Sequence, residues 1–63
     1  MNWLKILEAN ADLLTISEIE ILTYVLVKKK PISEIARTFE VSPARIRYIL
    51  KKGKEKLQNS NTN

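Results

Sequence analysis

The sequence predicts an all-α fold, a small domain of four helices. Its 63 residues include only one glycine and two prolines, and no stretch alternates apolar and polar residues as a half-buried strand does. Apolar residues instead recur at spacings of three and four, which places them on one face of a helix. We therefore expect one domain over residues 1–57 and a disordered polar tail over residues 58–63. A chain this short buries only about 60% of its unfolded surface, so any function must lie on the outside.

The first helix is expected over about residues 2–11. Asn2 is suited to the N-cap, because its side-chain oxygen can accept a hydrogen bond from a free backbone N–H of the first turn. Trp3 lies beside the predicted apolar stripe of this helix, which consists of Leu4, Leu7 and Ala11.

The second helix is expected over about residues 16–27. Thr15 is followed three residues later by Glu18, the spacing of a capping box, in which each side chain accepts the other residue's backbone N–H. Apolar residues occur on more than one face of this helix, which predicts a central position or a partner. The lysines of 28–30 suit its negative C-terminal end, and Pro31 interrupts the helical pattern.

The third helix is expected over about residues 32–39 and the fourth over about 43–57. Ser42 is the predicted N-cap of the fourth helix, and Pro43 follows at its first position, where the missing N–H is harmless. The fourth helix has a predicted buried stripe of Ile46, Ile49, Leu50, Gly53 and Leu57. A glycine on that stripe predicts close contact with the first or second helix, at a cost of about 1 kcal/mol relative to alanine.

The last two helices together fit a helix-turn-helix over about residues 32–51. When Ile32 is counted as the first position, Ala36 falls at the fifth, where the two helices cross closely. The residues expected to pack the two helices together are Ile35, Phe39, Val41, Ile46 and Ile49. The turn has no glycine, and Glu40 occupies the position where a positive φ is common. A positive φ at Glu40 would cost about 1 kcal/mol.

The two halves of the chain differ in the sign of their charge. Residues 1–27 carry one lysine and four acidic residues, a net charge of −3, whereas residues 28–63 carry ten basic and three acidic residues, a net charge of +7. This asymmetry predicts a polyanion on the C-terminal half, with nucleic acid the first candidate and an acidic membrane surface the second. Charge alone fits a merely solvated basic helix equally well.

The composition argues against an enzyme. The chain has no cysteine and no histidine, which removes disulfides, thiolate and imidazole nucleophiles and the usual transition-metal sites. The carboxylate pairs Glu18 with Glu20 and Glu34 with Glu40 have simpler roles in caps or on solvated faces, and no nucleophile and base are paired. We expect no catalysis, no metal and no cofactor.

The sequence also indicates the cellular location of the protein. Its apolar runs are shorter than the about 20 residues that span a membrane. No signal-peptide pattern is present, and together with the lack of cysteine this favours the cytoplasm of a cell without a nucleus. The small size suits a phage or mobile-element product.

Several short motifs resemble one family. Over about residues 13–57 the chain is similar to the fourth conserved region of bacterial sigma-70-type factors and to related LuxR-like regulator domains. Those domains carry a leucine-threonine start, an EIA helix, a VS cap and a basic helix that ends in a leucine. The matching residues are Leu14-Thr15, Glu34-Ile35-Ala36, Val41-Ser42, the RIRYI segment Arg45 to Ile49, and Leu57.

The resemblance implies that the fourth helix enters the DNA major groove and that the third braces it across the backbone. The residues that would face the bases are Ser42, Pro43, Ala44, Arg45, Arg47, Tyr48 and Lys51. Independently of the resemblance, Arg47, Tyr48 and Lys51 lie off the buried stripe, and arginine is the side chain that pairs bidentately with guanine. The residues better suited to phosphates are Lys28, Lys29, Lys30, Arg37, Lys52 and Lys54.

The chain departs from the family in three ways. It has no separate promoter-melting region, so we do not expect it to act as a complete sigma factor by itself. Ala44 stands where the family often has a charged residue, and with Pro43 it makes the helix tip apolar, suited at most to a thymine methyl group. The second helix has apolar residues where the family usually has Arg and Glu, which predicts a protein interface of Trp3, Ile16, Ile19 and Val25.

Two functions follow as hypotheses. The first is a sequence-specific regulator of transcription that binds double-stranded DNA, and a homodimer would present paired recognition helices about one DNA turn apart. The alternative is a protein-interaction module with a sigma region 4-like fold that binds RNA polymerase or another regulator. In a monomer, Trp3 would simply cover the core.

Overall fold

The computed structural model describes residues 2–60, and the side chains of residues 2–58. The described residues form four α-helices and no strand, which confirms the all-α prediction. The helices are α1 (Trp3–Ala9), α2 (Ile16–Leu22), α3 (Ile32–Phe39) and α4 (Pro43–Ser60). A short 3₁₀ helix, η1 (Ala11–Leu13), follows α1, and a π-helix, η2 (Thr23–Val27), continues α2 without a break.

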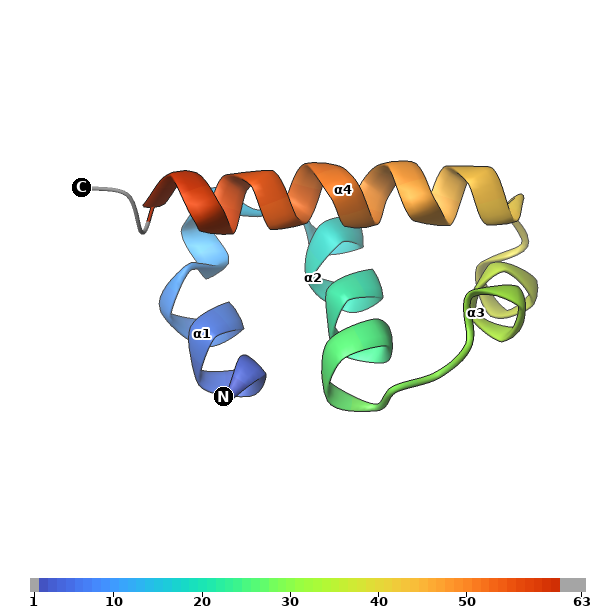
Figure 1. Cartoon of the computed structure of the whole chain (residues 1–63), viewed down its shortest axis with the longest axis horizontal. Coiled ribbons are helices and arrows are strands. Elements are labelled where there is room, and N and C mark those ends of the chain that lie inside the picture. The colour runs from blue at the N-terminus through green and yellow to red at the C-terminus, as the bar shows by residue number, and fades with distance from the viewer. Residues whose placement is uncertain (1, 61–63) are drawn as a thin grey trace.

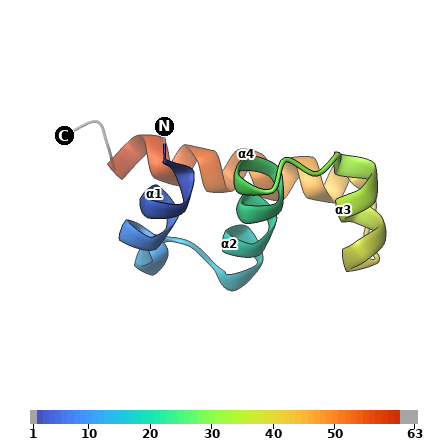
Figure 2. The same ribbon diagram turned by 90° about the horizontal axis from the view of Figure 1, so that it is seen from below.

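The longest helix, α4, runs along the whole molecule, and the other helices lie on one side of it (Figure 1). Its 18 residues correspond to about 27 Å of α-helix, most of the 35 Å long dimension of the chain. The helices α1 and α2 lie on the same side of α4 and run across its direction, and α3 lies at the end where α4 begins (Figures 1 and 2).

The first helix begins as predicted but ends early. The Asn2 side chain accepts a hydrogen bond from the Lys5 N–H at 3.2 Å, which confirms the N-cap. The helix stops at Ala9, because the Asn10 side chain turns back to donate to the Ile6 carbonyl at 2.8 Å, a local bond that competes with helix continuation.

The predicted apolar stripe of this helix is therefore wrong in two of its three members. Leu7 is buried, but Leu4 is 50% exposed and Ala11 is also exposed. Ala11 lies in η1, where the tighter 3₁₀ winding takes it off the stripe. Trp3 and Ile6 pack against the core in place of these two residues.

The second helix has the predicted capping box. The Thr15 N–H donates to the Glu18 carboxylate at 2.9 Å, and the Glu18 N–H donates to the Thr15 hydroxyl at 3.1 Å. The helical segment reaches Val27 as expected, but its last five residues form a π-helix, which sequence periodicity did not predict. The change begins at Thr23, whose hydroxyl donates to the Ile19 carbonyl at 2.7 Å, a bond that often bends helices.

The turn between α3 and α4 has the positive φ considered above for Glu40. Glu40 is left-handed, with φ 57° and ψ 44°. The Val41 N–H donates to the Ala36 carbonyl at 3.0 Å and the Glu40 N–H to the Arg37 carbonyl at 3.3 Å, the two bonds of a Schellman motif. The Ser42 hydroxyl then accepts from the Arg45 N–H at 3.2 Å, which confirms the N-cap of α4.

The core consists of two clusters. The leucine cluster joins α1 and α2 to the C-terminal half of α4 through Leu7, Leu14, Leu22 and Leu57. The α3 cluster joins α2 and α3 to the N-terminal half of α4 through Ile21, Ile35, Ala36 and Ile46. Phe39 and Ile49 pack against the α3 cluster as predicted, but Val41 is 39% exposed, because it follows the left-handed residue on the outside of the turn.

Gly53 marks the point where α2 meets α4. A Cβ atom at Gly53 would lie 2.7 Å from Leu22 Cδ1, closer than van der Waals contact allows without a shift. The glycine is buried, and the predicted close contact is confirmed, with α2 as the partner.

The last helix is longer than expected. It continues to Ser60, so the prediction of a disordered tail is wrong for residues 58–60, while residues 61–63 lie outside the described residues. No proline or glycine follows Leu57, and without such a residue a helix can extend along a polar stretch.

Candidate nucleic-acid interface

The N-terminal half of α4 presents an exposed, largely basic face behind an apolar tip of Pro43 and Ala44. Every residue predicted to read bases is exposed, either on the cap or on the first part of α4. The segment 42–52 contains no acidic residue. Ile46, in the same segment, is fully buried in the α3 cluster, so the core holds the opposite side of the helix in place.

The basic residues divide between two flanks of α4. Side chains three, four or seven residues apart share one side of a helix, so Arg45, Tyr48 and Lys52 form one flank, and Arg47, Lys51 and Lys54 form the other. A hollow on the first flank is shared with Thr15 and Ser17. A helix with cations spread over its exposed side in this way can reach both the phosphates along a groove and the base edges between them.

Tyr48 is held between two cations. Its ring centre lies 5.7 Å from the Arg45 guanidinium carbon and 5.7 Å from the Lys52 ammonium nitrogen. Contacts of this kind at exposed sites are worth about 0.5–1 kcal/mol each. They keep the Tyr48 ring, which is 53% exposed, in a defined position on the outer face.

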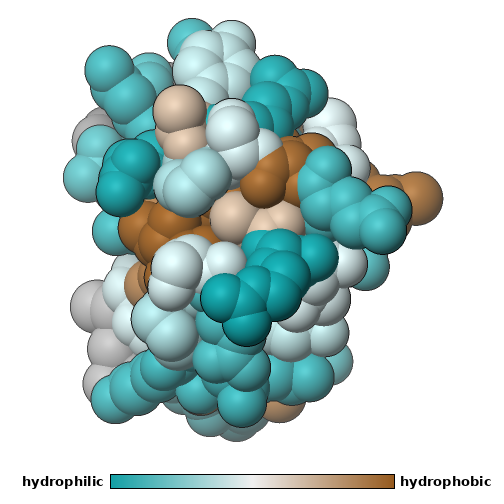
Figure 3. Space-filling view, turned by 90° about the vertical axis from the view of Figure 1, so that its right-hand side faces the viewer, coloured by the Kyte–Doolittle hydropathy of each residue, from teal (hydrophilic) through white to brown (hydrophobic). Residues whose placement is uncertain are grey.

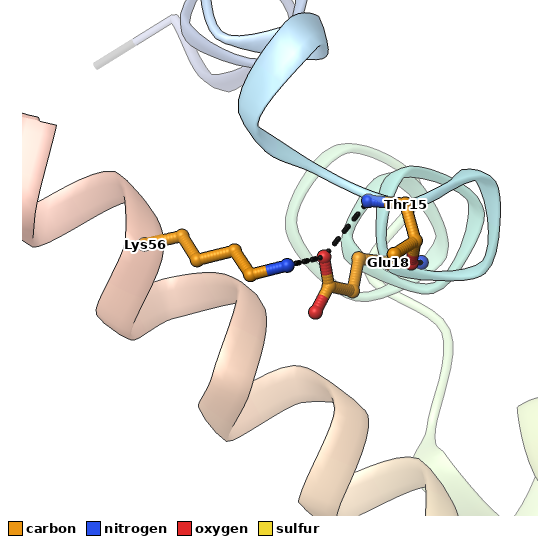
Figure 4. Close-up of polar contacts among 3 residues, drawn as sticks. All are labelled: Thr15, Glu18 and Lys56. Carbon is orange, nitrogen blue, oxygen red and sulfur yellow. Dashed lines mark hydrogen bonds and ion pairs between the residues drawn. The ribbon is translucent and has the colours of Figure 1, made fainter.

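A third contact on the first flank has a structural role instead. The Lys56 ammonium group lies 2.8 Å from the Glu18 carboxylate, which also accepts the Thr15 N–H (Figure 4). Burial by itself raises the pKa of Glu18, but the hydrogen bonds from Lys56 and Thr15 outweigh it, so the pKa lies below its ordinary value of 4.5. The pair ties α4 to the start of α2. No sequence spacing indicated it, because 38 residues separate its members.

The residues predicted to bind phosphates do not form one surface. Lys52 and Lys54 belong to α4 and Arg37 to α3, whereas Lys28, Lys29 and Lys30 lie in the connection between η2 and α3. That connection starts at the edge of the molecule opposite α4 (Figure 1). A duplex against the exposed face of α4 would therefore meet Lys52 and Lys54 first.

Two of the three consecutive lysines have partners within the chain. The Lys28 ammonium lies 4.7 Å from the centre of the Tyr24 ring, and the Lys30 ammonium lies 3.7 Å from the Glu34 carboxylate. Tyr24 also meets Phe39 edge to face, with ring centres 5.5 Å apart. The Lys30 ion pair therefore links the connection to the first turn of α3, and the Tyr24 ring links η2 to the last residue of α3.

The end of the molecule that carries α3 is mainly hydrophilic. Seen from this side, hydrophilic residues cover most of the surface, with hydrophobic patches across the middle and at one edge (Figure 3).

The residues predicted to form a protein interface are separated. Trp3 and Ile19 pack against the leucine cluster, and Val25 packs against the α3 cluster. Ile16, 77% exposed, stands at the first turn of α2. Trp3 and Val25 both line a groove at the other end of the α2 and η2 segment.

Within residues 2–60 we find no group of three or more acidic residues placed to hold a metal ion. None of the helices that the structure describes combines the length and apolarity needed to cross a membrane. The chain matches no protein-family model, no curated protein and no solved structure. The similarity to sigma region 4 and LuxR-like domains therefore rests on its own residues and motifs alone.

Proposed function

We propose that the chain is a non-enzymatic regulator of transcription that binds double-stranded DNA in a sequence-specific manner. Residues 43–52 of α4 act as the recognition helix in the major groove. The observation that carries the proposal is the exposed first part of α4, which has no acidic residue between 42 and 52 and exposes Arg45, Arg47, Tyr48 and Lys51. Ile46 anchors this part of the helix in the core from behind. An α-helix about 10–12 Å across fits a major groove about 12 Å wide.

The proposed roles follow from side-chain chemistry. Arg47 and Lys51 donate hydrogen bonds to guanine, which offers two acceptors in the major groove. Ala44, at the apolar tip of the helix, contacts a thymine methyl group. Arg37, Lys52 and Lys54 bind phosphates and set the register of the protein on the duplex without reading sequence.

The first test is the salt dependence of binding to duplex DNA. If the chain neutralises about five phosphates, the logarithm of the association constant should fall with the logarithm of salt concentration with a slope of about −4 to −5. Fluorescence anisotropy of a labelled duplex, measured over a range of salt concentrations, gives this slope. An interaction that is undetectable or independent of salt contradicts the proposal.

The second test removes the base-reading groups. Replacing Arg47 and Tyr48 together by alanine should abolish specific binding, because each good bidentate contact to a base is worth about 1–3 kcal/mol. Lys5→Ala is the control, since it removes one exposed positive charge from α1 and should leave the affinity unchanged. Equal losses in both variants would mean that binding depends on net charge alone.

The alternative, a protein-interaction module that binds RNA polymerase or another regulator, predicts that the double variant keeps its function. Selection of bound duplexes from a random pool, with the mass of the complex measured alongside, separates the remaining cases. A palindromic consensus on a doubled mass supports a homodimer, and a single short site supports a monomer. No enrichment at all favours the interaction module.

A further inference from the structure

An apolar groove lies at the edge of the molecule opposite α4. It is formed where the start of α1 meets the end of η2, and both of these ends lie far from α4 in Figure 1. Its lining includes the side chains of Trp3, Leu4, Val25, Leu26, Val27 and Lys29. Leu4 is 50% exposed and Val27 is 39% exposed. Neighbouring apolar residues left open to solvent in this way often mark a binding surface.

The groove has a positive rim. Lys29 lines it, and no acidic residue is among the described residues that do so. Lys28 and Lys30 stand on either side of Lys29 in the chain, but Tyr24 and Glu34 engage their ammonium groups. Of the three lysines, Lys29 is therefore the one placed to meet a carboxylate from outside.

The backbone at Lys29 is in an uncommon conformation. Its φ is 56°, a left-handed conformation that costs a residue with a side chain about 1–2 kcal/mol. The following N–H, of Lys30, donates to the Tyr24 carbonyl at 2.9 Å and closes the end of η2. The π-helix and this turn together bring Val25, Val27 and Lys29 to the same groove, and backbone strain of this kind is concentrated at functional sites.

We infer that this groove binds an amphipathic helix of another protein, with acidic residues beside its apolar anchors. A groove between two helix ends suits recognition of a helix. In this mode, apolar residues of the bound helix, spaced three, four and seven apart, fill the floor of the groove. A carboxylate at the edge of such a helix would pair with Lys29. A second copy of this chain fits less well, because a two-fold contact would set groove against groove, and the described lining of each groove offers Lys29 but no carboxylate to pair with it.

The groove is independent of the proposed DNA-binding face, since none of its lining residues belongs to α4. A partner could therefore occupy it while α4 holds a duplex. In the proposed regulator, this arrangement would let a partner protein be recruited to DNA.

The test is selection of helical peptides of about 15 residues from a displayed random library against the wild-type chain, followed by titration of the enriched peptides. Trp3 is the only tryptophan of the chain and lines the groove, so its fluorescence reports occupancy directly. We expect enriched peptides to combine large apolar residues at helical spacing with aspartate or glutamate, and to shift Trp3 emission to shorter wavelength. Lys29→Glu should weaken their binding about tenfold or more.

Matched variants give the experiment its controls. Lys5→Glu makes the same charge change at an exposed position of α1 that does not line the groove, and should leave binding unchanged. Leu4→Glu and Val27→Glu place a charge on the floor at exposed positions and should both abolish peptide binding while duplex affinity and helical circular dichroism persist. Arg47→Ala should leave peptide binding intact.

Several outcomes would overturn the inference. Failure of any peptide to be enriched, enrichment of peptides without acidic residues, or equal effects of Lys29→Glu and Lys5→Glu would each contradict it. Dimerisation in sedimentation that Leu4→Glu abolishes would assign the groove to a second copy. A Trp3 shift with phosphatidylglycerol vesicles, lost in Leu4→Glu, would assign it to a lipid surface.

Discussion

The two core clusters are similar in size but support different surfaces. The α3 cluster is built mainly from isoleucine, whose branched Cβ restricts its rotamers, and it anchors the first half of α4, where the basic residues are exposed. All four buried residues of the leucine cluster are leucines, which are not branched at Cβ. In α1, which contributes Leu7 to this cluster, Leu4 is half exposed. The α3 cluster therefore lies behind the basic part of α4, whereas Trp3 and Leu26, which pack against the leucine cluster, line the apolar groove.

The clusters are joined through α2 and α4. Ile21 belongs to the α3 cluster and its neighbour Leu22 to the leucine cluster, so α2 contributes to both. Gly53 receives Leu22 on α4, and the ion pair of Glu18 with Lys56 ties the start of α2 to the same helix. Substitutions at these places and within each cluster show how far the two parts of the molecule depend on each other.

The largest effect is expected from Gly53→Leu. The new side chain would have to displace Leu22 and push α2 away from α4, so both clusters should lose packing at once. We expect a loss of about 3 kcal/mol or more in the free energy of unfolding, enough to unfold much of so small a domain. Urea unfolding followed by circular dichroism measures it.

The control is Lys54→Leu, which introduces the same leucine side chain at the neighbouring, exposed position. It should change the free energy of unfolding little. Equal stability of the two variants would mean that α2 and α4 can separate freely at Gly53.

Large-to-small substitutions within each cluster should come next. Leu7→Ala and Ile35→Ala each remove a buried side chain, at an expected cost of about 2–5 kcal/mol. Amide hydrogen exchange should then distinguish them, with faster exchange in α1 for Leu7→Ala and in α3 for Ile35→Ala. Uniformly faster exchange in both variants would show that the two clusters unfold as one cooperative unit.

Glu18→Gln should have an intermediate effect that depends on pH. It removes a charge-assisted hydrogen bond and weakens the capping box, at a cost of about 1–3 kcal/mol at neutral pH. The pKa of Glu18 is lowered in the folded chain, so its contribution is present above the unfolded pKa and is lost as the pH falls through the folded pKa. The stabilities of variant and wild type should therefore converge as the pH falls through the folded pKa of Glu18, which lies below 4.5.

Urea midpoints measured from pH 7 down to about pH 3 test this convergence. Glu20→Gln, at an exposed position of the same helix, is the control and should follow the wild type over the whole range. A constant difference between Glu18→Gln and the wild type would show that the ionised carboxylate is not responsible.

The smallest effect is expected at the left-handed residues. Glu40→Gly should be neutral or stabilise the chain by up to about 1 kcal/mol, because glycine adopts a positive φ without strain but is more flexible when unfolded. Thermal unfolding measures it, and Thr38→Gly in the body of α3 is the control, with an expected loss of about 0.5–1 kcal/mol. A clear loss of stability in Glu40→Gly would mean that the Glu40 side chain has a role in the turn.

Local features of the fold could be predicted from the sequence. The N-cap at Asn2, the capping box of Thr15 with Glu18, and the cap of α4 at Ser42 each depend on atoms no more than three residues apart. The exposure of the basic face of α4 followed in the same way, because helical periodicity places its residues away from the buried stripe.

Other features could not be predicted, because they depend on segments that only the fold brings together. The predicted protein interface is divided, because Ile16 lies at one end of the α2 and η2 segment and Trp3 and Val25 lie at the other. This division follows from the positions of α1 and η2 in the fold, which the sequence did not show. Lys28–Lys30 are likewise separated from Lys52 and Lys54 because α2 runs away from α4, and only the structure shows this direction (Figure 1).

The sequence by itself determined the four helices, most of their boundaries and caps, and the basic face of α4, since backbone propensity and periodicity act over a few neighbouring residues. The tertiary structure alone decided the π-helix that ends in a left-handed lysine, the ion pair between residues 38 positions apart, and the apolar groove. These depend on packing between distant segments, whose geometry depends on how whole helices fit against one another.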